Sequence, residues 1–140
     1  MSKVAVVYWT GTGNTGAMAE AVAAGAQEAG AEVLLCTCGD FSATKMDEYD
    51  AVAFGCPAMG AEELEDSEFL PMFTECEPKL AGKKIALFGS YGWGDGEWMR
   101  TWEEQVKGDG AVLAAECLIV NEAPDDDGLA KCKALGAALI

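Results

Sequence analysis

Short apolar runs alternate with helix-forming stretches about five times along this chain of 140 residues. The runs cover residues 4–8, 32–36, 50–55, 83–89 and 111–120. They are apolar throughout rather than alternating with polar residues, which is typical of strands buried on both faces of a parallel sheet. Such strands need long crossover segments, and helices in those segments cover the sheet. The pattern therefore predicts an α/β fold in one domain over residues 1–140.

The segments between the runs carry helix signals. Helices are predicted over residues 16–29, 68–77 and 97–107, and a last one begins at Pro124. Gly30 stands where a C-cap glycine belongs, and Ser67 is the expected N-cap of the second helix. In the last helix, apolar residues recur at helical spacing, namely Leu129, Cys132, Leu135 and Leu139.

Three loops that follow predicted strands are rich in glycine, threonine and aromatic or acidic residues. They cover residues 10–15, 57–66 and 90–96. In doubly wound parallel sheets, ligands bind beyond the carboxyl ends of the strands, where the strand order reverses. We therefore expect the functional site at these three loops.

The charge balance excludes several classes of function. The chain has 9 Lys and Arg against 24 Asp and Glu, a net charge of −15, and no histidine. So acidic a surface repels nucleic acid, and the lack of imidazole excludes Ser-His and Cys-His catalysis. The six cysteines include no C-x-x-C motif, so we expect no metal site and interpret them as small apolar fillers.

The chain also lacks signals for export or membrane insertion. Its first residues, 1–4, lead directly into the first apolar run without the plan of a signal peptide. No apolar run reaches the ~20 residues of a membrane span. We expect a soluble, cytoplasmic protein, and a monomer because the high net charge disfavours self-association.

The first loop has the composition of a phosphate site. Gly11, Gly13 and Gly16 fit G-x-G-x-x-G, but no Gly-Lys-Ser/Thr follows, so the loop is not a P-loop. Four side chains add neutral donors to the amides of a helix N-terminus: Thr10, Thr12, Asn14 and Thr15. Such donors can surround a terminal phosphate monoester, which here would be held without any Lys or Arg.

All three loops resemble those of the short-chain, clostridial-type flavodoxins. The matching segments are residues 10–15, 56–65 and 89–94, in the right order and after the right strands. The resemblance implies a doubly wound sandwich with a five-stranded parallel sheet of order 2-1-3-4-5 and one non-covalently bound FMN. It also implies a low-potential one-electron carrier that shuttles between semiquinone and hydroquinone and has no substrate or catalytic residue of its own.

The resemblance also implies roles for individual residues. Trp93 would stack on the outer face of the flavin, and Met59 would cover the inner face. Glu63 would accept a hydrogen bond from the flavin N3–H, or Glu62 would if the loop register shifts by one. The full set of implied cofactor-binding residues is Thr10, Gly11, Thr12, Gly13, Asn14, Thr15, Pro57, Ala58, Met59, Gly60, Ala61, Glu63, Ser90, Tyr91, Gly92 and Trp93.

Gly60 is the first central residue of a predicted turn over residues 59–62. In the family that the chain resembles, the peptide after this glycine turns over when the flavin takes its first electron and proton. Glycine allows a positive φ at this position, whereas Ala61 resists one at the next. We therefore expect Ala61 to favour modestly the turn that accompanies the half-reduced flavin.

The expected partners are redox enzymes with basic docking surfaces, such as the partners of ferredoxins, because the acidic surface favours basic ones. Four alternatives remain open on the sequence. The glycine motif also fits an NAD(P)-binding enzyme, and a phosphorelay receiver has the same size and fold class. A flavin-free interaction module and a flavin-dependent reductase with a small substrate are the other two.

Overall fold

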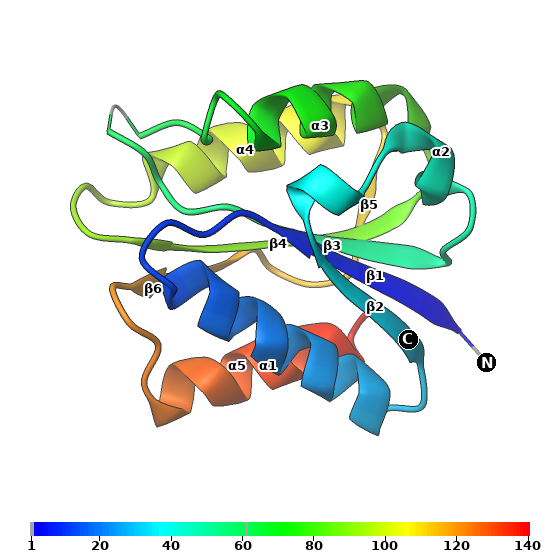
Figure 1. The fold of residues 1–140 in the computed structure, drawn as a ribbon, viewed down its shortest axis with the longest axis horizontal. Coiled ribbons are helices and arrows are strands. Elements are labelled where there is room, and N and C mark those ends of the chain that lie inside the picture. Colours follow the sequence, from blue (N-terminus) through cyan, green and yellow to red (C-terminus); the bar gives the residue numbers. More distant parts are fainter. Residues whose placement is uncertain (1, 61) are drawn as a thin grey trace.

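A computed structural model describes residues 2–60 and 62–140. Figure 1 shows a twisted sheet lying between two layers of helices. The elements in chain order are β1 (Lys3–Tyr8), α1 (Asn14–Glu28), β2 (Glu32–Thr37), the 3-10 turn η1 (Cys38–Asp40), α2 (Ala43–Met46), β3 (Ala51–Gly55), α3 (Phe69–Cys76), η2 (Glu77–Lys79), β4 (Lys84–Tyr91), α4 (Glu97–Gly108), β5 (Val112–Leu113), β6 (Leu118–Asn121) and α5 (Asp126–Ala137).

The sheet has the predicted parallel order, β2-β1-β3-β4-β5. β1 pairs with β2 on one side and with β3 on the other, and all the strand pairs are parallel. The chain therefore reverses its direction of progress across the sheet between β1 and β3. Loops that leave the carboxyl ends of these two strands diverge there, which opens space for a ligand.

The last strand differs from the prediction. A continuous strand was expected over residues 111–120, but the structure has two short strands, β5 and β6, which both pair with β4. Lys84–Ile85 pair with β5, and Phe88–Tyr91 pair with β6. Between these ladders, β4 has two residues, 86 and 87, whereas the segment between β5 and β6 has four, 114–117. The two extra residues cannot join the ladder and divide the strand.

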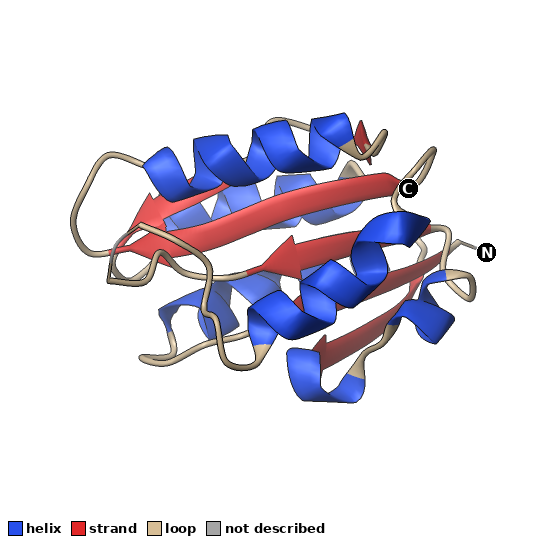
Figure 2. Ribbon diagram, turned by 90° about the horizontal axis from the view of Figure 1, so that it is seen from above, coloured by secondary structure: helices blue, strands red, loops and turns tan. Residues whose placement is uncertain are grey.

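Separate cores lie on the two faces of the sheet. In Figure 1, α1 and α5 cover one face, and α3 and α4 cover the other. The view in Figure 2 shows the strands between these two helix layers. On the α3 and α4 side, the Trp102 ring meets Phe69 and Phe73 edge-to-face, with ring centroids 5.6 and 5.5 Å apart. Within residues 2–60 and 62–140, no helix is long and apolar enough to cross a bilayer.

The N-terminus of α3 is capped differently from the prediction. Ser67 was expected to cap it. Instead Glu65 is buried, and its carboxylate accepts hydrogen bonds from the amides of Ser67, Glu68 and Phe69 at 2.8–2.9 Å and from the Ser67 hydroxyl. Burial alone would raise the pKa of Glu65, but the hydrogen bonds from Ser67, Phe69 and Glu68 outweigh it and lower the pKa to about 2. The Glu65 carboxylate therefore caps the helix, and Ser67 donates hydrogen bonds to it.

The cysteines behave as the sequence predicted. All six are free thiols, four of them buried and the other two, Cys36 and Cys117, half-buried. Burial raises the pKa of the Cys56 thiol to about 12, so this group stays protonated and unreactive. Its role is packing beneath the second loop.

Two glycines allow α1 and α5 to pack unusually closely. A Cβ on Gly25 would lie 2.0 Å from the Lys133 carbonyl oxygen, and one on Gly136 would lie 2.0 Å from the Val22 carbonyl oxygen. Both obstacles are backbone atoms, so they cannot rotate away. The helices can approach this closely only because neither residue has a side chain.

Gly25→Ala is therefore expected to lower the free energy of unfolding by about 2 kcal/mol, because the overpacking cost exceeds the gain in helix propensity. Gly108→Ala is the matched control, since a Cβ at this helical glycine meets no atom within 4 Å. Urea denaturation of both variants measures the difference. Equal free energies of unfolding for the two variants would contradict this expectation, because they would show that α1 and α5 can move apart without loss of stability.

Candidate functional site

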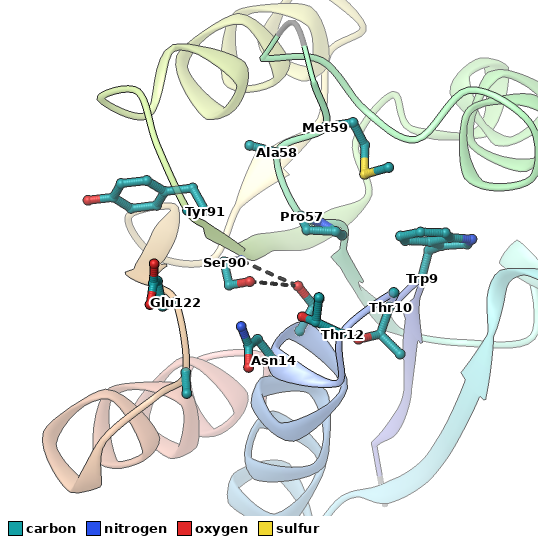
Figure 3. Close-up of a pocket in the computed structure, with 14 residues that line it drawn as sticks. Trp9, Thr10, Thr12, Asn14, Pro57, Ala58, Met59, Ser90, Tyr91 and Glu122 are labelled. Carbon is teal, nitrogen blue, oxygen red and sulfur yellow. Dashed lines mark hydrogen bonds between the residues drawn. The ribbon is translucent and has the colours of Figure 1, made fainter.

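A cavity of about 570 Å³ opens at the carboxyl ends of the central strands. Its wall combines the three predicted loops with residues that follow β6 (Figure 3). The lining residues are Trp9, Thr10, Gly11, Thr12, Asn14, Thr15, Pro57, Ala58, Met59, Ser90, Tyr91, Gly92, Glu122 and Ala123. The cavity lies at the switch point between β1 and β3, where the fold class places its ligands.

The structure brings most of the predicted residues to this cavity. Gly13, Gly60, Glu63 and Trp93 lie in the same loops but outside the lining, and Ala61 lies outside the described residues. Trp93 is 63% exposed, so its ring stands in solvent beside the cavity. Three lining residues were not predicted: Trp9, Glu122 and Ala123. Trp9 directly precedes the glycine loop, a position that could have drawn attention to it.

The first loop is held by the hydroxyl of Thr10. Its Oγ1 accepts hydrogen bonds from the amides of Gly13 at 3.1 Å and Gly16 at 3.2 Å. Gly13, with φ 97°, adopts the left-handed conformation that starts α1. A hydroxyl that accepts two bonds still has its own proton to donate, so Thr10 retains one donor for a ligand.

The start of α1 supplies further donors. Asn14 and Thr15 are the first residues of the helix, so their amides have no intrahelical acceptor. The helix dipole adds partial positive charge at the same end. Together with the Thr12 hydroxyl and the Asn14 amide side chain, these groups make a concentrated set of neutral donors for an anion.

Thr15 connects the first loop to the end of β4. It is 1% exposed, and its Oγ1 lies 3.4 Å from both the hydroxyl and the amide nitrogen of Ser90. Figure 3 draws both contacts as dashed lines beside Ser90. The Thr15 hydroxyl therefore has a structural role in addition to any contact with a ligand.

Two backbone hydrogen bonds join described residues of the second loop, where the sequence predicted a turn over residues 59–62. The amide of Glu62 donates to the Met59 carbonyl at 2.7 Å, and the amide of Met59 donates to the Glu63 carbonyl at 2.9 Å. Gly60 does not use the positive φ that glycine permits, and a Cβ there would meet no atom within 4 Å. The conformation of Ala61, on which the expected turn preference depends, lies outside the described residues.

Glu62 links the second loop to the third. Its Oε1 accepts a hydrogen bond from the Asp95 amide at 3.1 Å. Gly94 has φ +85°, which disfavours any residue with a side chain, and a Cβ there would lie 1.7 Å from this oxygen and displace the Glu62 side chain. The Glu62 carboxylate is thus half-buried between the loops, whereas the neighbouring Glu63 is exposed.

Trp9 and Glu122 stand on opposite sides of the cavity (Figure 3). The Trp9 Nε1 donates to the Glu68 carboxylate at 3.1 Å, which fixes the indole against the start of α3. The Glu122 amide donates to the Tyr91 carbonyl at 2.7 Å, which fixes the segment after β6 against the end of β4. These contacts hold the two side walls in place.

The cavity fits a phosphate ester that carries a flat apolar group. Its donors are neutral and gather at one helix N-terminus, and no described lining residue carries a positive charge. The remaining wall offers the Trp9 indole, the Met59 thioether and the Tyr91 ring, which suit a polarizable ring system. A volume of this size accommodates a mononucleotide-sized ligand.

Comparisons with known proteins agree with this geometry. A sequence model of the flavodoxin family matches residues 6–136. The flavodoxin of Megasphaera elsdenii is 49% identical over 135 residues, which cover 96% of each chain. The flavodoxin of Clostridium beijerinckii is 49% identical over 121 residues, covering 86% of this chain and 88% of that protein.

Solved structures give the same result. The solution structure of two-electron reduced Megasphaera elsdenii flavodoxin superposes with a TM-score of 0.89 at 47% sequence identity, and 97% of each chain is covered. A flavodoxin from the domain Archaea superposes with a TM-score of 0.85 at 29% identity.

Proposed function

The chain belongs to the flavodoxin family of FMN-binding electron carriers, and on this premise we propose that it carries single electrons at low potential between redox proteins, with no substrate of its own. One observation supports the proposal above the others. The donors at the start of α1 are neutral and face a cavity of mononucleotide size at the switch point of the sheet. FMN supplies the redox chemistry when it is bound.

We propose that the phosphate of FMN lies in the loop of residues 10–15. There its oxygens would accept hydrogen bonds from the amides of Asn14 and Thr15 and from the hydroxyls of Thr10 and Thr12. Because no basic side chain is present, binding of the phosphate dianion depends on how these N–H and O–H groups are oriented. The hydrogen bonds from the Gly13 and Gly16 amides to Thr10 hold the loop in this conformation before the ligand binds. Gly11 and Gly13 would allow the backbone to approach the phosphate.

The ring would lie between the second and third loops. Met59 and Trp93 would cover its two faces, and Pro57, Ala58 and Gly60 would complete the inner wall. The backbone of Ser90, Tyr91 and Gly92 would meet its pyrimidine edge. Trp93 is exposed beside the cavity, a position from which its ring can close over a bound flavin.

Of the two adjacent carboxylates, we propose that Glu62 rather than Glu63 accepts from the flavin N3–H. Glu62 is half-buried and already fixed by the Asp95 amide next to the third loop, whereas Glu63 faces solvent. A preoriented carboxylate loses less freedom when it binds a donor.

Glu62→Gln is expected to weaken FMN binding about tenfold, because a charge-assisted hydrogen bond becomes a neutral one. Glu63→Gln, which removes the same charge from the next residue, is expected to change the affinity by less than about twofold. Quenching of flavin fluorescence at fixed ionic strength measures both. A larger loss in Glu63→Gln would assign the role to Glu63.

We propose that residues 1–140 form a single domain and that the carrier acts as a monomer. Its net charge of −15 favours docking on basic surfaces of redox enzymes, including those that ferredoxins serve. The six free thiols suit a reducing compartment, and we propose the cytoplasm.

Anaerobic titration of the FMN-loaded protein with dithionite, followed by visible absorption, tests the proposed function. A one-electron carrier gives two separate reduction steps with a distinct spectrum between them. Reduction by both electrons together would contradict the proposal. Sustained turnover of a small substrate with a nicotinamide donor would favour a flavin-dependent reductase instead.

A further inference from the structure

Glu122 is the one charged side chain among the described residues that line the cavity. The remaining lining residues are neutral, and none of them supplies a compensating cation. A carboxylate is an unexpected group in the wall of a site whose neutral donors are arranged for an anion. Glu122 is exposed, so solvent partly screens its charge, but no described lining residue supplies a cation that would neutralise it.

The backbone holds Glu122 at this place at a cost. Its φ is 56°, the left-handed region that a residue with a side chain rarely adopts. The Glu122 amide donates to the Tyr91 carbonyl at 2.7 Å, and the Asn121 Nδ2 donates to the same oxygen at 3.3 Å. Two donors on one acceptor fix the segment, and they keep Glu122 at the cavity wall despite the strain.

We propose that Glu122 makes the cavity discriminate the charge of its ligand. Its carboxylate opposes negative charge on a bound flavin, so it weakens the binding of a phosphorylated flavin relative to an unphosphorylated one. This inference rests on the proposed function, because it takes FMN as the occupant of the cavity.

Paired affinities for FMN and riboflavin test the inference, since the two differ only in the phosphate. Glu122→Gln is expected to bind FMN roughly fivefold more tightly and riboflavin unchanged, as follows from removing one partly screened repulsion. Glu122→Asp keeps the charge and is expected to match the wild type. Glu122→Gly loses the charge but adopts the left-handed backbone freely, and its ratio of FMN to riboflavin affinity is expected to equal that of Glu122→Gln.

Glu20→Gln is the control for net charge, because Glu20 is exposed on α1 and does not line the cavity. It is expected to leave both affinities unchanged.

The two proposals fail in different ways. A wild-type protein that does not bind FMN overturns the proposed function and this inference with it. A wild-type protein that binds FMN, together with a Glu122→Gln variant that binds it no more tightly, overturns the inference alone. Equal changes in FMN and riboflavin affinity would also overturn it, because they would show a structural effect rather than a charge effect.

Discussion

Replacing Asn14 by aspartate is expected to weaken FMN binding about 100-fold, because it places a carboxylate next to the phosphate dianion. Asn14 is the first residue of α1 and lines the cavity. Aspartate has nearly the same shape, so the change adds charge without adding bulk. An acidic residue in the first helical turn is favourable for the helix, so the fold is expected to be retained.

Two comparisons separate this charge effect from a structural one. Riboflavin lacks the phosphate, so its affinity for Asn14→Asp is expected to stay within about twofold of the wild-type value. Gln27→Glu makes the same change of charge at an exposed position near the other end of α1, and it is expected to leave FMN affinity unchanged. Flavin fluorescence quenching measures all these affinities. Retained FMN affinity in Asn14→Asp would place the phosphate elsewhere.

Glu65→Gln is expected to lower the free energy of unfolding by about 3 kcal/mol at neutral pH. The buried carboxylate holds three amides and one hydroxyl at the start of α3, and a neutral amide accepts these bonds less strongly. Asp66→Asn is the control, since Asp66 is the exposed neighbour. It is expected to change stability by less than about 0.5 kcal/mol.

The contribution of Glu65 also has a defined pH dependence. Folding lowers its pKa from an ordinary value of 4.5 to about 2, so the folded state favours the ionised form. Its contribution is fully present above pH 4.5 and is lost as the pH falls towards 2. Urea denaturation at several pH values should show the wild type and Glu65→Gln converging across this interval. A constant difference would show that the charge of Glu65 contributes nothing.

The fold was predictable because its signals are local. The run around Val4–Val7 is fully buried, as continuous apolar character predicts for a central parallel strand. The split between β5 and β6 was missed, although Ala114, Ala115 and Glu116 have a lower strand propensity than the Val, Leu and Ile residues on either side. Their exclusion follows from the register of both ladders with β4, which is a tertiary property.

The site was predictable where function resides in a contiguous motif. Residues 10–15 combine glycine, hydroxyl and amide groups in one loop, and the structure places five of these six residues in the cavity wall. The burial of Glu65 was not predictable, because nothing in the sequence distinguishes it from the neighbouring acidic residues. Its hydrogen bonds to three backbone amides form only in the folded chain. Glu122 is also separated in sequence from the other loops, and only the pairing of β6 with β4 brings it to the wall.

The central claim is that one FMN occupies the cavity between the three loops and the segment after β6. A crystal structure of the protein reconstituted with FMN tests this claim most directly. The account predicts the phosphate within hydrogen-bond distance of the Asn14 and Thr15 amides, and the ring between the loops of Met59 and Trp93. A phosphate bound away from residues 10–15, or a ring outside these two loops, would contradict it.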